Sequence, residues 1–286
     1  MNELFFKDLG VFYITNVCNL TCENCVTFSN RNFKGHFYWK DYKDKYIEWS
    51  KKITFDHINV FGGEPYTNPD LLTWVLELKK YWPNCKEYSI STNGTHLKNN
   101  IELSRKIIDE NYFLDVCVHD PATRESIESD LENILSVYEI SIIKENTTYH
   151  FFRNGRRVAR LWNGYVFTKN AADRVVNNVT FFRRSDPIAA HTLCINSCEP
   201  NVVFVRGQLF KCHLTAISKD LTTQFQFDQY GTDLLKKYRP ADPFDSDEDL
   251  KNFWDGLNNP IEQCQLCPER NSVAPIWPLA KTKTKY

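Results

Sequence analysis

Strand-like and helix-like segments alternate along the first half of the chain, and this alternation constrains the fold more than any other feature. Short strand-prone runs are each followed by segments whose apolar residues recur at helical spacing. Strands are expected at 9–15, 57–61, 87–91 and 113–118, and helices at 42–52, 71–78, 101–111 and 123–138. Repeated units of this kind predict an α/β fold with a parallel sheet, a full or partial (β/α) barrel.

The pattern changes from residue 147 onwards. Two Asn-Gly pairs, Asn154-Gly155 and Asn163-Gly164, lie between strand-prone runs, and such pairs are the strongest short-range signal for a hairpin. They predict an antiparallel meander over 147–168, so the barrel is expected to be incomplete or decorated. A further strand pair is expected over 202–209. We expect a core domain over 1–185 and a small cysteine-rich α+β domain over 186–286.

Charge composition excludes two classes of partner. Lys plus Arg is 35 and Asp plus Glu is 36, which gives a net charge of −1. This balance argues against a broad electrostatic grip on nucleic acid or on an anionic membrane. No apolar run approaches the roughly 18 residues of a membrane span, and acids stand near the N-terminus where an export signal needs basic residues. We therefore expect a cytoplasmic protein.

Cysteines are numerous for such a protein. The chain has 10, and in a compartment that keeps thiols reduced, clustered cysteines more often bind metal or take part in catalysis than form disulfides. Cys85 and Cys117 stand apart from the others; Cys117, in an apolar run, is interpreted as a small buried hydrophobic residue. The remaining eight fall into two groups.

The first group is Cys18, Cys22 and Cys25, in a C-x3-C-x2-C pattern directly after the first predicted strand. Three thiolates can hold three irons of a four-iron cluster and leave the fourth iron open, and an open position distinguishes a catalytic metal site from a structural one. The alternative is a zinc site that takes His36 or His57 as its fourth ligand.

Further polar and glycine-rich segments follow the next three strands. They are Gly62-Gly63-Glu64-Pro65, Thr92-Asn93-Gly94 and His119-Asp120. In parallel α/β folds, ligands bind at the carboxyl ends of the strands, so these segments and the three cysteines are expected to form a single site. The glycine pair allows close backbone approach, and Glu64 can accept a hydrogen bond from an amino group.

In their order and placement, the C-x3-C-x2-C loop, Gly62–Pro65 and Ser91-Thr92-Asn93-Gly94 closely resemble the radical S-adenosylmethionine superfamily. The resemblance implies a [4Fe-4S] cluster on Cys18, Cys22 and Cys25 that binds S-adenosylmethionine, with Gly62, Gly63 and Glu64 at the methionyl amino group. It makes Ser91, Asn93, His119 and Asp120 plausible contacts to cofactor or substrate; the alternative is that these residues only face solvent at the strand ends.

The second cysteine group resembles the Twitch domain, a shortened relative of the SPASM domain that follows many such cores. Cys194 is followed by twelve residues, Gly207, four residues and Cys212, and later by the pair Cys264 and Cys267. The resemblance implies that these four cysteines hold a second, auxiliary [4Fe-4S] cluster. The alternative is a structural zinc ion. Cys198 is a fifth thiol, which is either a substitute ligand or a bystander.

Together, the two resemblances predict a radical S-adenosylmethionine enzyme. It would cleave S-adenosylmethionine reductively, take a hydrogen atom from a small molecule or a peptide, and pass an electron to the auxiliary cluster. A reductant such as flavodoxin or ferredoxin is implied. The alternative function is a non-catalytic zinc- or cluster-binding module that recognises nucleic acid or protein, for which Arg153, Arg156, Arg157 and Arg160 form the one candidate basic stretch.

Overall fold

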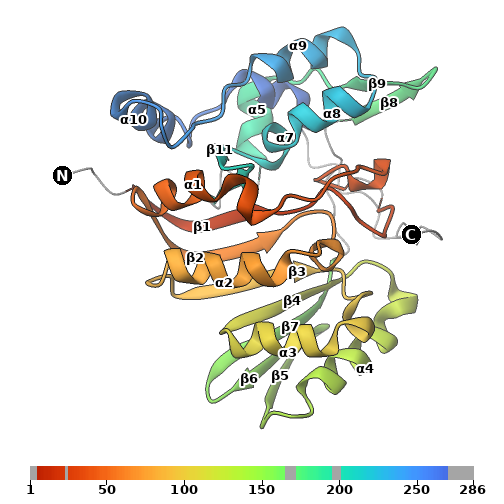
Figure 1. The fold of residues 1–286 in the computed structure, drawn as a ribbon. Helices are drawn as coiled ribbons and strands as arrows, with labels where there is room; N and C mark the ends of the chain where they lie inside the picture. Colours follow the sequence, from red (N-terminus) through yellow and green to blue (C-terminus); the bar gives the residue numbers. More distant parts are fainter. Residues whose placement is uncertain (1–4, 23–24, 165–171, 195–200, 270–286) are drawn as a thin grey trace.

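The computed structural model describes residues 5–22, 25–164, 172–194 and 201–269. A mixed sheet of nine strands runs through the molecule in the order β11-β10-β1-β2-β3-β4-β7-β6-β5 (Figure 1). Its strands are β1 (Phe5–Tyr13), β2 (Ile53–Phe61), β3 (Glu87–Thr92), β4 (Tyr112–Val118), β5 (Ser141–Glu145), β6 (Thr148–Arg153), β7 (Arg156–Asn163), β10 (Asn201–Val205) and β11 (Gln208–Phe210). A separate hairpin joins β8 (Ala172–Val176) to β9 (Val179–Phe182).

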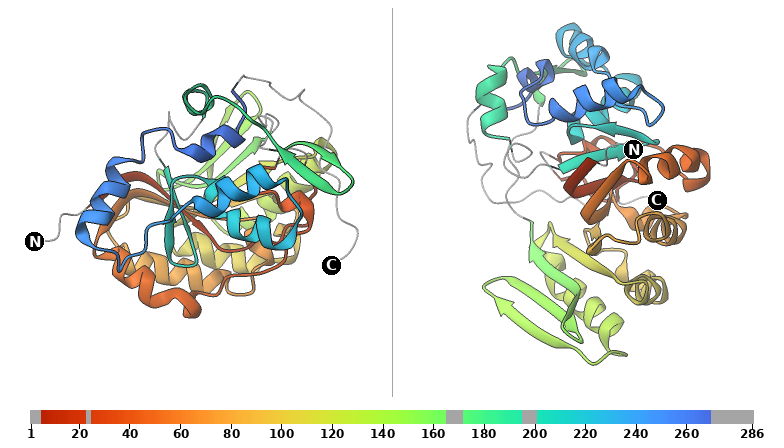
Figure 2. Two further views of the ribbon diagram at one scale, coloured as in Figure 1. Left: turned by 90° about the horizontal axis from the view of Figure 1, so that it is seen from above. Right: turned by 90° about the vertical axis from the view of Figure 1, so that its left-hand side faces the viewer.

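The predicted parallel α/β core is confirmed. β1, β2, β3 and β4 pair in parallel in sequence order, and four helices lie along one face of this part of the sheet (Figures 1 and 2). These helices are α1 (Trp39–Ser50), α2 (Leu71–Tyr81), α3 (Ile101–Asp109) and α4 (Arg124–Leu135). The strand side chains beneath them are fully buried, as at Ile58, Val60 and Leu114, so this layer is the main hydrophobic core.

The meander differs from its prediction at one turn. Asn154-Gly155 does join β6 to β7 antiparallel, and both residues adopt the positive φ of a tight hairpin turn. Asn163-Gly164, in contrast, makes no hairpin: β7 runs parallel to β4 up to Val118↔Asn163. β7 is therefore a fifth parallel strand, and the connection to it from β4 runs through α4 and then the β5–β6 hairpin. β7 ends at Asn163, on the same edge of the sheet as the carboxyl ends of β1 to β4.

The C-terminal part of the chain returns to this sheet. β10 pairs in parallel with β1, and β11 pairs antiparallel with β10; the turn between them at Arg206-Gly207 agrees with its prediction. The remaining helices gather beyond this edge (Figure 1). They are α5 (Pro187–Thr192), α7 (His213–Ala216), α8 (Ser218–Gln224), α9 (Gln229–Lys237), α10 (Asp247–Asp255) and the 3-10 helix η5 (Glu262–Leu266).

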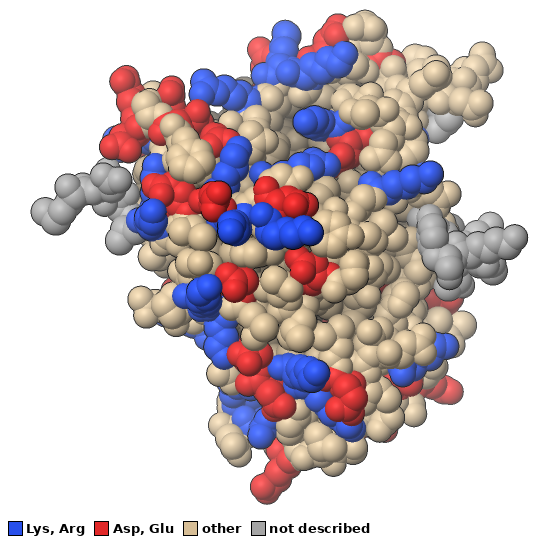
Figure 3. Space-filling view, viewed as in Figure 1, with Lys and Arg blue, Asp and Glu red and all other residues tan. Residues whose placement is uncertain are grey.

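The surface agrees with the balanced composition. Basic and acidic side chains are interspersed over the face seen in Figure 3. Among the described residues, no helix has the length and apolar character needed to cross a membrane.

Candidate functional site

The two glycines after β2 pack against the chain that leads from β1 to the cysteine loop. The N–H of Gly63 donates to the carbonyl of Thr15 at 2.8 Å, and the N–H of Glu64 donates to that of Val17 at 2.8 Å. A Cβ on Gly62 would lie 2.6 Å from the Thr15 oxygen, and one on Gly63 would lie 2.3 Å from the Val17 oxygen. The pair therefore packs closely against the chain's own backbone, one residue before Cys18, and its expected contact with a ligand stays a prediction.

We expect Gly63→Ala to disturb the cysteine loop. The added Cβ overlaps the backbone of Val17, which cannot yield as a flexible side chain can, and such overpacking typically costs about 1–3 kcal/mol. Iron bound after anaerobic reconstitution, measured against protein, should fall clearly below that of the parent chain, and the melting temperature should fall. Gly256→Ala is the matched control, because its Cβ would come no closer than 3.3 Å to any atom. Equal iron contents in both variants would contradict this role for Gly63.

Glu64 is completely buried, and its carboxylate ties together the ends of two strands. It accepts hydrogen bonds from the Thr92 hydroxyl at 2.7 Å, the Asn93 N–H at 2.8 Å and the Tyr66 N–H at 3.2 Å. Burial raises the pKa of Glu64 to about 7, although the three hydrogen-bond donors lower it. The side chain thus holds Asn93 in place at the end of β3, and its two oxygens already have partners within the protein.

The three cysteines of the loop lie next to this arrangement. Cys18 and Cys22 are 8 % and 9 % exposed and Cys25 is half-buried. The pKa of the Cys18 thiol is raised, first by burial and then by the nearby charges of Glu64, Cys25 and Cys22. Cys18, Leu20 and Cys22 form one small buried cluster, and Cys25 packs against it, so the structure brings the three thiols together. Each would need to lose its proton to bind a metal, which iron or zinc would favour.

Side chains around the loop hydrogen-bond to the cysteine sulfurs. The Cys18 sulfur accepts from the Leu20 N–H at 3.4 Å and from the Asn93 amide at 3.8 Å, and the Cys25 sulfur lies 3.1 Å from the Thr27 hydroxyl. The Asn93 amide also donates to Asn19 at 2.9 Å. Such hydrogen bonds orient metal ligands and lower the charge on their sulfurs, so these surroundings fit three thiolate ligands.

The other residues predicted to contact the cofactor or substrate each have a different hydrogen-bond partner. The Nδ1 of His119 lies 3.3 Å from the Gly164 carbonyl, at the ends of β4 and β7, and burial lowers the pKa of its imidazole. Asp120 accepts from the Ala122 N–H at 3.0 Å and caps a 3-10 turn, so its carboxylate has a local structural role. Ser91 hydrogen-bonds to Asn59 on the face of the sheet that lies away from α1–α4.

The second group of cysteines lies on elements of which several contact one another: α5 packs against η5, and α7 packs against β10 and β11. Cys194 follows α5, Cys212 begins α7, and Cys264 and Cys267 belong to η5 or its end. Burial and then the charges of Cys212, Cys194 and Cys264 hold the pKa of the Cys267 thiol well above its usual value. Cys198 lies outside the described residues.

A buried lysine accompanies these four thiols. Lys211 is 6 % exposed, and its ammonium donates to the Leu257 carbonyl. Burial lowers the pKa of Lys211, while the nearby charges of Cys264, Cys212 and Cys194 raise it. Because thiolates and their clusters carry negative charge, a cation at this position fits a four-thiolate site better than four neutral thiols.

Two comparisons decide what fold this is. A family model described as a 4Fe-4S single cluster domain matches residues 9–136, which include all three cysteines of the loop. The crystal structure of BtrN in complex with AdoMet and 2-DOIA aligns over 95 % of this chain and 98 % of its own, with a TM-score of 0.50 and 16 % identity. The chain has the fold of a radical S-adenosylmethionine enzyme.

Two other solved structures align less well. The structure of anSMEcpe with bound AdoMet and the Cp18Cys peptide aligns over 46 % of this chain and 40 % of its own, with 15 % identity and a TM-score of 0.36. The structure of Streptococcus suis SuiB bound to the precursor peptide SuiA aligns over 90 % of this chain and 66 % of its own, with 10 % identity and a TM-score of 0.40. No curated protein sequence matches the chain.

The arginines of the basic stretch interact with other residues of the chain. Arg153 donates to Asp109 at 3.1 Å, Arg156 donates to the Ile108 carbonyl at 3.2 Å, and Arg157 lies 3.8 Å from Glu87. Arg160 is paired with Asp115. Each of the four arginines therefore has a partner within the chain.

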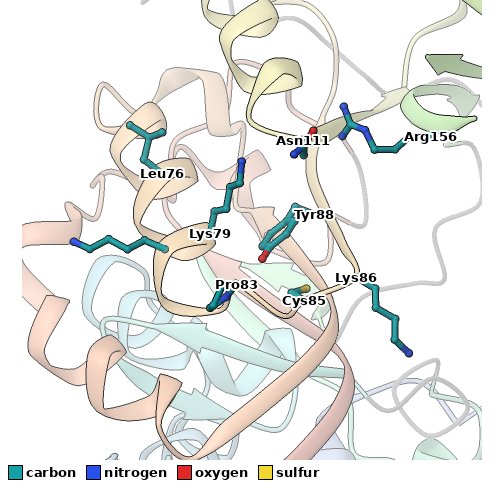
Figure 4. A pocket seen from close by; sticks show the side chains of 9 residues that line it. Leu76, Lys79, Pro83, Cys85, Lys86, Tyr88, Asn111 and Arg156 are labelled. Carbon is teal, nitrogen blue, oxygen red and sulfur yellow. The ribbon is translucent and has the colours of Figure 1, made fainter. Parts of the chain in front are cut away.

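A cavity of about 580 Å³ lies at the amino ends of the strands, away from both cysteine groups (Figure 4). Its lining is basic, with Lys79, Lys80, Lys86 and Arg156 beside Cys85 and Tyr88. The three lysines are already paired, at 2.9 Å with Glu110, 3.3 Å with Glu77 and 2.9 Å with Asp56. Because these carboxylates compensate the lysine charges, we assign the cavity no anion.

Proposed function

We propose that this chain is a radical S-adenosylmethionine enzyme that takes a hydrogen atom from its substrate with a 5′-deoxyadenosyl radical. When bound at Cys18, Cys22 and Cys25, a [4Fe-4S] cluster supplies the electron for reductive cleavage of S-adenosylmethionine. The observation that carries the proposal is the packing of the cysteine loop. Its three cysteines pack together, and the loop lies beside Gly62-Gly63 at the end of β2 and Asn93 at the end of β3.

The surrounding residues would act on the cofactor in two ways. Asn93 and His119 lie at the ends of adjacent strands and offer polar atoms toward the loop and β7, so we assign them to direct contact with S-adenosylmethionine. Gly62, Gly63 and Glu64 would position the cysteine loop and Asn93 through the backbone contacts described above. Ser91, which lies further along the sheet, would contact the substrate end of the site.

We further propose that Cys194, Cys212, Cys264 and Cys267 hold an auxiliary [4Fe-4S] cluster, as in a Twitch domain over 186–286. The buried Lys211 ammonium beside these thiols supports a negatively charged thiolate site. Metal analysis would decide between a cluster and a structural zinc ion.

The substrate that we favour is a small molecule. The BtrN structure that aligns with nearly the whole chain contains AdoMet and 2-DOIA. The second cluster would accept the electron left after hydrogen abstraction, which makes the net reaction an oxidation. A cytoplasmic flavodoxin or ferredoxin would supply the first electron.

Metal analysis tests this proposal. Anaerobically reconstituted protein should contain about eight irons and eight sulfides per chain, from two four-iron clusters. After reduction with dithionite in the presence of S-adenosylmethionine, it should release 5′-deoxyadenosine and methionine. Zinc without iron in anaerobic preparations would instead support the binding-module alternative.

A further inference from the structure

Two lysine side chains are buried without a carboxylate to balance their charge. Lys7 and Lys211 are 9 % and 6 % exposed, and no other basic residue that the structure describes is buried to this degree. Neither ammonium group forms an ion pair with a carboxylate of the described residues. Buried acids, in contrast, are ion-paired, as Asp115 is with Arg160. Because a buried charge without a counter-charge is costly, the two lysines indicate an anion that the carboxylates of this chain do not supply.

Both ammonium groups contact the same turn, where α10 ends. The Lys211 ammonium donates to the Leu257 carbonyl, and the Lys7 ammonium lies 5.3 Å from the centre of the Trp254 ring. The Leu257 N–H donates to the Trp254 carbonyl at 3.1 Å, so these two residues belong to one turn. The carbonyl end of a helix favours cations, but its partial charge is smaller than the charges of two ammonium groups.

This turn adjoins the segments that carry the second cysteine group. Lys211 directly precedes Cys212, and the chain continues from Leu257 into η5, which contains Cys264. η5 packs against α5, and Cys194 follows α5. Burial lowers the pKa of Lys211, and the nearby charges of these three cysteines raise it. A cluster bound by thiolates at this group would therefore supply the missing negative charge.

Such a placement has a consequence for electron transfer. A four-iron cluster bound by four thiolates is an anion, and it gains a further negative charge when it is reduced. Nearby positive charges stabilise the reduced form more than the oxidised form, so they raise the reduction potential of the cluster. Because both lysines are shielded from solvent, their effect is screened less than that of surface charges.

We propose that Lys7 and Lys211 raise the reduction potential of the auxiliary cluster and thereby make it the electron acceptor of the reaction. The inference rests on the proposed function, since it needs a cluster at the second cysteine group. The substrate first loses a hydrogen atom to the 5′-deoxyadenosyl radical. The substrate radical then gives one electron to the auxiliary cluster and one proton to water, so the substrate is oxidised by two electrons and the cluster is reduced by one.

The reduction potentials of the two clusters test this proposal. A redox titration of the anaerobic holoenzyme, followed by electron paramagnetic resonance, should show two signals. Added S-adenosylmethionine should change only the signal of the first cluster, which has the open iron. In Lys211→Met the auxiliary cluster should shift to lower potential, and its ratio of reduced to oxidised form at a fixed potential should fall about tenfold. Lys211→Arg keeps the positive charge and should stay close to the parent potential.

Lys7→Met is the second variant, and it decides the test if Lys211→Met binds too little iron, because Lys7 is not next to a cysteine in the chain. It should shift the auxiliary cluster in the same direction. Lys52→Met is the matched control, since the Lys52 ammonium donates to the Pro243 carbonyl at 2.6 Å but has Glu48 as a counter-charge at 3.8 Å. An unchanged auxiliary potential in both Lys7→Met and Lys211→Met would overturn the proposal. An equal shift in Lys52→Met, or of the first cluster, would do so as well.

The same titration separates this inference from the proposed function. If the parent holoenzyme shows only the signal that responds to S-adenosylmethionine, the proposed auxiliary cluster is wrong, and the inference drawn from it is wrong too. If a second signal is present but its potential does not respond to the loss of either lysine, the auxiliary cluster stands and only the role of Lys7 and Lys211 is contradicted.

Discussion

Replacing Cys18, Cys22 and Cys25 together by Ala should abolish formation of 5′-deoxyadenosine. Without these thiolates no iron would be left with an open position for S-adenosylmethionine. The proposed auxiliary cluster would not substitute, because cysteines would take all four of its positions. Bound iron should fall by about half, from about eight to about four per chain. Iron and sulfide analysis, together with chromatography of the nucleoside after dithionite reduction, measures both effects.

Cys85→Ala is the control for this experiment. Cys85 is also a partly buried thiol, but it hydrogen-bonds to the carbonyls of Asp56 and Glu87 at the amino ends of the strands. Its loss should leave the iron content and nucleoside formation unchanged. If the triple variant still forms 5′-deoxyadenosine at the parent rate, the assignment of the cofactor to these cysteines is wrong.

The sequence predicted the edge of the sheet where the site lies, because strand-end positions follow from the alternation alone. It did not predict what the residues there contact. Gly62 and Gly63 also pack against residues 15–17, a contact that depends on the pairing of β1 with β2, while their expected contact with a ligand stays a prediction. Likewise, nothing local indicates that Glu64 meets Thr92 and Asn93, which are 28 and 29 positions away.

The polar face of the sheet, which α1–α4 do not cover and which carries Asn59 and Ser91, was missed, although the sequence carries a signal for it. Strands of a fully covered parallel sheet are nearly continuous apolar runs, whereas here polar residues alternate with apolar ones, as in His57-Ile58-Asn59-Val60 and Ser89-Ile90-Ser91. That alternation indicates one open or ligand-lined face. The hairpin predicted at Asn163-Gly164 was wrong. The pair fits a hairpin turn, but it follows a strand that pairs in parallel with β4. Local turn propensity does not indicate which distant strand will be the partner.

Replacing Cys212 and Cys267 by Ala should separate the two proposed metal sites. A site closed by four cysteines offers no iron to S-adenosylmethionine, so cleavage without substrate should remain close to the parent rate. Turnover of the substrate should be lost, because the electron left after hydrogen abstraction would no longer have its acceptor. Single-turnover assays that follow 5′-deoxyadenosine with and without that substrate, and the oxidised product alongside, measure the two steps separately.

Folding must be controlled here, because cluster ligands also stabilise the domain that holds them. Cys212 contacts Thr215 at 3.5 Å at the start of α7, so Thr215→Val is a matched variant that alters the same turn and keeps every thiol. Both variants should melt cooperatively before they are compared. If the cysteine variant is folded and also loses cleavage without substrate, the two sites do not act separately. If it converts the substrate at the parent rate, the second metal has only a structural role, and zinc becomes the better assignment because an ion without redox chemistry can hold a fold but cannot accept the electron.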